Sequence, residues 1–294
     1  MADMTSTTMA IWVPARWSAK ATETYRSNTV YEPRLDHSWE NELGVGQGDR
    51  VNIPGFTQNN AARNRGAGTG IFGTGAAVTF DAVTEAQLQL IVNRFYYKAH
   101  RAPVEAKAQA MPSYWPKLVE GEGNAIALQI DADIAGDNTN GIDAFTTVVG
   151  VDNVDITEDD LLTAQTNLDN QNAPTKDRFL TVSPASFTSM LKIESVRNSL
   201  YKGSLGNLSA DKETGYQGAY LSFDVYKTNN NEAGTAGKKN GAFQREAIAY
   251  ASQISLKSLN NTNIQDGVLE QYITFQTCGF LIIKNAFGNE LDGK

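Results

Sequence analysis

The stretch PVEAKAQAMPSYWPKLVEGEGNAIALQIDADIAGD, residues 103–137, decides how we interpret the rest of the chain. It begins with good helix formers, which predict a short helix over 103–111 until Pro112 and Pro116 interrupt it. Beyond them, apolar or small residues recur at helical spacing and form one stripe: Val119, Gly123, Ile126, Ala127, Ile130 and Ile134. The spacing predicts a long helix over about 117–135, which we call the spine helix.

Two glycines, Gly121 and Gly123, lie inside this predicted helix. Each costs up to about 1 kcal/mol relative to alanine in a helix interior. We therefore expect another part of the protein to pack closely against the helix backbone at this point.

The composition limits the possible functions. The chain has 294 residues, 41% hydrophobic, which is enough for one large domain or two ordinary ones. A net charge of -8 argues against a protein whose main task is to hold nucleic acid electrostatically. Cys278 is the single cysteine, so no internal disulfide forms, and a reducing compartment is expected. The polar N-terminus and the lack of a long apolar run predict a soluble protein made in the cytoplasm, with no membrane partner.

The first 45 residues have no sustained hydrophobic period, although they are rich in aromatic side chains: Trp12, Trp17, Tyr25, Tyr31 and Trp39. Such a segment cannot bury these side chains against itself. It must lie along its own domain or along a neighbouring subunit, and the residues leave both alternatives open.

A long hairpin is predicted between this arm and the spine helix. A turn at Gly48 leads into a short strand that Pro54 should end, and β-rich residues return at 78–80 and 88–92. Residues 55–77 between them are rich in Gly, Asn, Ala and Thr. Since an isolated hairpin is marginal in water, a long one implies a partner surface. The other interpretation is a disordered surface loop.

A mixed α/β body is predicted after the spine helix. Thr157 should cap a helix over Glu158–Asn170, and Ser183 should cap another that opens with Pro184. Strands are predicted at 178–182, 219–226, 268–277 and 279–284, and polar loops at 137–141, 203–218 and 229–241.

Motifs that carry chemistry are nearly absent. The glycines at 68, 70 and 73 match a dinucleotide-binding pattern, but no helix is predicted after them. The run that begins at Asp131 resembles a calcium loop but has Ala135 and Ile142 where ligands are required. With two histidines and one cysteine, a metal site or a nucleophile pair has few residues to draw on. We therefore expect no catalytic residue, cofactor or metal. A hydrolase or carbohydrate-binding module with a carboxylate pair, Asp131 and Asp133, stays as the alternative from another class.

The order of these pieces resembles the major capsid protein of tailed bacteriophages, the fold typified by phage Hong Kong 97. Five stretches carry the resemblance: GDRVNIP at 48–54, FYYKAHR at 95–101 with VEAKAQ at 104–109, RFLTVSP at 178–184, FDVYKTNN at 223–230 and REAIAYA at 245–251. It extends from about Trp39 to Gly288.

The resemblance implies an α+β capsid-shell fold in four parts: an N-terminal arm at 1–47, an extended hairpin loop at 48–92, a peripheral domain with the spine helix at 93–137 and 243–294, and an axial domain at 138–242. It implies a structural protein that assembles as hexamers and pentamers into the icosahedral head of a virion, made in the host bacterial cytoplasm, around double-stranded DNA bound without sequence specificity. A portal and, in some relatives, a decoration protein would be further partners. Candidate inter-subunit contacts are Trp12, Trp17, Phe56, Arg63, Arg65, Ile71 and Phe72.

Two departures from the family pattern limit what is carried over. Some relatives cross-link their shells through a lysine in the extended loop, but this sequence has no lysine between Asp49 and Leu90. Others begin with a fused scaffolding segment, whereas only a short arm precedes Trp39, so scaffolding is expected from a separate protein. Within the structural class, the alternative is an encapsulin, a cellular nanocompartment that encloses a cargo enzyme.

Overall fold

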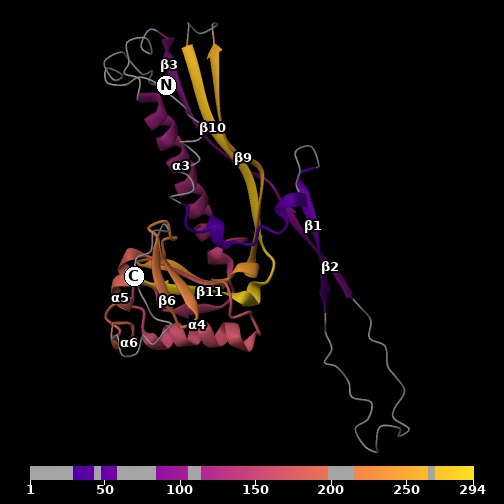
Figure 1. Cartoon of the computed structure of the whole chain (residues 1–294). Coiled ribbons are helices and arrows are strands. Elements are labelled where there is room, and N and C mark those ends of the chain that lie inside the picture. Colours follow the sequence, from indigo (N-terminus) through magenta and orange to yellow (C-terminus); the bar gives the residue numbers. More distant parts are fainter. Residues whose placement is uncertain (1–28, 43–47, 58–83, 105–113, 198–214, 264–268) are drawn as a thin grey trace, which may run out of the picture.

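The computed structural model describes residues 29–42, 48–57, 84–104, 114–197, 215–263 and 269–294. Its described part consists of a two-stranded hairpin, a three-stranded sheet with one long helix beside it, and a six-stranded sheet with helices (Figure 1). The long helix and the long strands run together from the body, and the hairpin projects in another direction (Figure 1). None of the helices in these ranges is long and apolar enough to cross a membrane.

The spine helix, α3, spans Tyr114–Gly136, as the apolar stripe predicts. The stripe faces the protein interior: Val119, Ile126, Ala127, Ile130 and Ile134 are all buried. Close packing against the helix backbone was expected at Gly121 and Gly123, and this expectation is wrong at Gly121. Gly121 has open space around it, since an added Cβ atom would meet nothing within 4 Å. The predicted short helix at 103–111 lies outside the described residues from position 105 onward.

The three-stranded sheet has the antiparallel order β3-β10-β9, formed by β3 (Arg94–Pro103), β10 (Leu269–Ile282) and β9 (Ile248–Asn263). The predicted pair of strands at 268–277 and 279–284 is wrong, because β10 is continuous through Gly279. This glycine marks a close approach rather than a break. A Cβ atom at Gly279 would overlap the carbonyl oxygen of Ile91, so the strand needs glycine where the hairpin crosses it.

The hairpin consists of β1 (Arg50–Thr57) and β2 (Thr84–Ile91), paired antiparallel from Arg50 opposite Ile91 to Thr57 opposite Thr84. The prediction that Pro54 ends the first strand is wrong. β1 pairs with β2 alone, so it has a free edge on which the missing N–H of proline costs no ladder bond. The tip of the hairpin, at 58–83, lies outside the described residues.

The six-stranded sheet has the order β4-β11-β8-β5-β7-β6. Its strands are β4 (Val148–Gly150), β11 (Gly288–Gly293), β8 (Lys238–Gln244), β5 (Arg178–Val182), β7 (Phe223–Lys227) and β6 (Tyr216–Tyr220). Its helices are α4 (Glu158–Asn170), α5 (Pro184–Met190) and α6 (Glu194–Arg197). The described residues also form short 3-10 turns: η1 (Glu32–Arg34), η2 (Glu40–Glu42), η3 (Ile142–Ala144), η4 (Arg245–Ala247) and η5 (Asn285–Phe287).

The two predicted helix caps are confirmed. Thr157 accepts a hydrogen bond from the backbone of Asp160, whose carboxylate in turn accepts from the Thr157 backbone, which completes a capping box. Ser183 accepts from the backbone of Ser186, and Pro184 occupies the first helical position.

Three predictions for the body are wrong. The predicted strand at 219–226 is a hairpin of β6 and β7, with a tight turn at Leu221 and Ser222, both at positive φ without the usual glycine or asparagine. The predicted loops at 203–218 and 229–241 extend too far at their C-terminal ends, because β6 begins at Tyr216 and β8 at Lys238, and residues 203–214 lie outside the described residues. The last strand, β11, was not predicted, since GNELDG has no alternating apolar pattern.

Candidate subunit-contact surfaces

Side chains of β3 alternate between two environments. Alternate residues from Arg94 point towards α3: Arg94 forms an ion pair with Asp137, and the hydroxyl of Tyr96 donates to Asp133 at 2.6 Å. Tyr272 and Thr274 of β10, which pair with this face of β3, are buried. One face of the three-stranded sheet therefore packs against the spine helix through these residues.

The opposite face of the same sheet carries exposed apolar side chains. Phe95 is 54% exposed, Tyr97 is 63% exposed and Leu259 on β9 is 55% exposed. Phe95 lies against both Tyr97 and Phe275, with ring centroids 5.8 and 5.6 Å apart. These residues form the outer sheet face: Phe95, Tyr97, Phe275, Ile273 and Leu259. A contiguous exposed apolar surface of this kind is typical of a protein contact site.

Among the described residues, the hairpin packs on the body at its base. Val51, Ile53, Leu90 and Val92 form a small core cluster with Ala249 and Ala251 of β9. Farther out, β1 and β2 pair with each other and leave the body (Figure 1). A two-stranded ribbon that projects in this way lacks the apolar support on which hairpins depend in water.

The described part of the N-terminal arm packs on its own subunit. Tyr31 and Leu35 are fully buried in the core that contains Ile130 and Ile134 of the spine helix. The Tyr31 hydroxyl also donates to Asn231 at 2.5 Å. Of the two alternatives for the arm, packing along its own domain is correct for residues 29–42.

The predicted contact residues are placed unevenly. Phe56 belongs to β1, where its backbone pairs with Glu85. The other six lie outside the described residues: Trp12, Trp17, Arg63, Arg65, Ile71 and Phe72. The outer sheet face was not predicted, although the alternation of Phe95 and Tyr97 with Arg94 and Lys98 places the two aromatic residues on one side of a strand.

Two acids of the spine helix are buried. Asp131 accepts hydrogen bonds from the backbone N–H groups of Val30, at 2.7 Å, and Tyr31, at 3.1 Å. Burial raises the pKa of Asp131 to about 7, against the lowering effect of these two donors. Burial likewise raises the pKa of Glu122 to about 7, against a hydrogen bond from Thr274 and the charge of Lys98.

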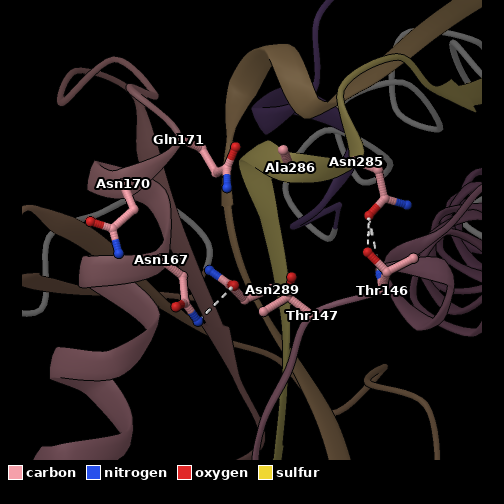
Figure 2. Close-up of a pocket in the computed structure, with 8 residues that line it drawn as sticks. All are labelled: Thr146, Thr147, Asn167, Asn170, Gln171, Asn285, Ala286 and Asn289. Carbon is pink, nitrogen blue, oxygen red and sulfur yellow. Dashed lines mark hydrogen bonds between the residues drawn. The ribbon is translucent and has the colours of Figure 1, made fainter.

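The carboxylate pair considered for a hydrolase does not form an active site. Asp131 is turned inward to the Val30 and Tyr31 amides, whereas Asp133 is held by Tyr96 and Gln129. Neither acid lines the pocket of about 560 Å³ that lies between α4 and η5 (Figure 2). This placement removes the structural support for that alternative.

The pocket in Figure 2 is lined by uncharged groups: Thr146, Thr147, Asn167, Asn170, Gln171, Asn285, Ala286 and Asn289. Some of its carboxamide groups already form hydrogen bonds with other lining residues: Asn285 accepts one from Thr146 at 2.8 Å, and Asn289 accepts one from Asn167 at 3.4 Å. No lining residue can act as a general acid or base near neutral pH.

The described residues offer little support for a cysteine nucleophile or a metal site. Burial raises the pKa of the Cys278 thiol to about 12, so it stays protonated and unreactive at neutral pH. Within the ranges that the structure describes, no three His, Cys, Asp or Glu side chains gather closely enough to hold a metal ion.

No protein-family model and no curated protein matches the chain. Solved structures do match it over nearly its whole length. A structure from Mycobacterium phage Che8 is 18% identical with a TM-score of 0.68, and the match covers 90% of this chain and 92% of that one. The capsid structure of the cyanophage P-SCSP1u is 15% identical with a TM-score of 0.64, over 92% and 89% of the two chains.

A virus-like particle from Pyrococcus furiosus is also similar, at 10% identity and a TM-score of 0.55, over 94% of this chain and 97% of that one. At these identities the likeness establishes the fold. The chain has the mixed helix-and-sheet fold of tailed-phage capsid subunits, as the resemblance in the sequence implies.

Proposed function

We propose that this protein is the major capsid protein of a tailed phage, a structural subunit that assembles into the icosahedral head around double-stranded DNA. The observation that carries the proposal is the outer sheet face, in a chain with the capsid-subunit fold. Phe95, Tyr97 and Leu259 are each more than half exposed on one sheet, and beyond its base the hairpin projects away from the body of its own subunit. Both features are costly in an isolated monomer and are explained if neighbouring copies cover them.

Assembly needs no chemistry beyond interface burial. A specific interface buries about 1,600 Å² in total, and a shell subunit has several neighbours, so individually weak contacts add up. We propose hexamers and pentamers of this chain, with the four-part division of arm, extended loop, peripheral domain and axial domain. Phe56, with Arg63, Arg65, Ile71 and Phe72, would then contact a neighbour from the hairpin, and Trp12 and Trp17 from the arm.

The further partners are proposed from the family resemblance: a separate scaffolding protein, a portal and, in some shells, a decoration protein. The net charge of -8 suits a wall that encloses DNA without binding it tightly. The shell would form in the host bacterial cytoplasm and persist as the virion capsid.

The hairpin tip provides the test. Residues 58–70 are rich in Gly, Asn and Ala, and ordering each residue costs about 1–2 kcal/mol of backbone entropy. Only contacts with a neighbour would offset that cost. Deleting 58–70 should therefore leave thermal unfolding of the subunit nearly unchanged but prevent closed shells in electron micrographs of the purified protein, assembled with its scaffolding protein where one is needed.

A Tyr97→Ser variant tests the outer sheet face in the same assay. This side chain is already 63% exposed, so its replacement should barely change subunit stability and should reduce shell yield. Normal shells from both variants, or a wild-type protein that stays monomeric with and without scaffold, would refute the proposal.

An encapsulin is the second candidate, favoured by the similarity to the virus-like particle from Pyrococcus furiosus. The TM-score of that match, 0.55, is lower than those of the two phage structures, 0.68 and 0.64. It would enclose a cargo enzyme instead of DNA. Neighbouring genes distinguish the two: portal, terminase and tail genes indicate a phage, and a cargo enzyme gene indicates an encapsulin.

A further inference from the structure

Glu122 lies where the spine helix packs against the strands β3 and β10. Its side chain is 1% exposed, between α3 and the strands β3 and β10. One carboxylate oxygen accepts a hydrogen bond from the Thr274 hydroxyl, which lies 2.9 Å from the Ser258 hydroxyl. The other oxygen, Oε1, is buried and has no hydrogen-bond partner. A buried carboxylate with an unsatisfied oxygen is unfavourable when it is ionised.

The surroundings offer Glu122 little compensating charge. From β3, His100 lies with Nε2 3.6 Å from Oε1, and Lys98 is exposed on the same side of the strand. From β10, Tyr272 is bonded to Glu270, and behind Thr274 lies the Ser258 hydroxyl of β9, which does not titrate. One helical turn to either side of Glu122, α3 carries apolar residues only: Leu118, Val119, Ala125 and Ile126.

His100 does not supply a firm positive charge. Burial and the nearby Lys98 lower the pKa of His100 below its usual value, so the imidazole is mostly neutral at pH 7. Burial raises the pKa of Glu122 from 4.5 to about 7. Because the folded value lies above the unfolded one, the stability that neutral Glu122 contributes is complete below about pH 4.5 and is lost as the pH rises through about 7.

We propose that Glu122 makes the docking of the first turns of α3 onto the three-stranded sheet depend on pH. The helix end is held closely when Glu122 is protonated and loosens when Glu122 ionises. Gly121 and Gly123 flank the acid and weaken the helix at this point, so the change can stay local. The buried stripe from Ile126 to Ile134 holds the remainder of the helix at either pH. This device is a property of the single subunit and holds whether or not the proposed function is correct.

Hydrogen exchange of the purified full chain, followed by mass spectrometry from pH 5.5 to 8.5, measures this docking directly. After correction for intrinsic exchange rates, amides of residues 117–125 should open at least about 10-fold more often at the upper pH. A pKa rise from 4.5 to about 7 limits the change over this pH range to about 30-fold. Residues 126–136 should change little.

Glu122→Gln should abolish this pH dependence, because the neutral amide mimics the protonated acid. Glu120→Gln, on the same turn, is the matched control and should retain the wild-type dependence. Opening of the wild-type helix that does not change with pH, or a Glu122→Gln variant that keeps the wild-type response, would overturn the proposal.

Thr274→Val gives an independent reading if Glu122→Gln folds poorly. This change removes the hydrogen bond that favours ionised Glu122, so the midpoint of the opening transition should move to higher pH. A midpoint that stays in place, or that moves to lower pH, would contradict the role assigned to Glu122.

Discussion

Replacing Asp131 with alanine should release the anchor that fixes the N-terminal arm across the spine helix. The carboxylate is fully buried and accepts from the backbone of Val30 at 2.7 Å and of Tyr31 at 3.1 Å. Without it, two buried N–H groups lose their partners, and each orphaned donor costs about 1–3 kcal/mol. The variant also no longer buries a carboxylate that is poorly solvated when it is ionised, and this offsets part of the lost stability.

Measurements at two pH values distinguish the lost hydrogen bonds from the removal of the buried carboxylate. Burial raises the folded pKa of Asp131 to about 7, so its contribution to stability is complete below its unfolded pKa and is lost as the pH rises through 7. At pH 5 we expect Asp131→Ala to lower the free energy of unfolding by about 2–4 kcal/mol. At pH 8 the loss should be clearly smaller.

Urea unfolding of the full chain at the two pH values measures these differences. Gln129→Ala is the control, since this exposed residue lies on the same helix and its replacement should stay within about 0.5 kcal/mol of wild type. A loss below about 1 kcal/mol at pH 5, or an equal loss at both pH values, would refute the anchoring role.

Further predictions concern backbone space and capping. Gly279→Ala should destabilise the subunit by about 1–3 kcal/mol, because the new methyl group would overlap the Ile91 carbonyl. Gly121→Ala is its matched counterpart: with open space around it, this change should stabilise the subunit by up to about 1 kcal/mol, and urea unfolding that ranks the two variants in the opposite order would contradict the packing described. Thr157→Ala should cost about 1 kcal/mol by removing the capping box with Asp160, and an unchanged unfolding midpoint would show that the box contributes nothing.

Local chemistry made several elements predictable from the sequence. The apolar stripe around Ile130 predicted the spine helix because a helix buries one face at a fixed period. Thr157 and Ser183 predicted helix starts because their side chains satisfy backbone donors only a few residues away. These interactions lie within one helical turn, so a single sequence contains all the information they need.

The tertiary structure alone decided which residues meet across long separations. Gly279 looked like a strand break because nothing in its own segment shows that Ile91 crosses there. Asp131 was considered as half of a catalytic carboxylate pair, because its actual partners, Val30 and Tyr31, are about 100 residues away. The outer sheet face around Tyr97 likewise became visible only when β10 and β9 placed Phe275 and Leu259 beside it. Periodicity shows that a helix or strand has an apolar face, but only its neighbours in the folded protein show whether that face is covered.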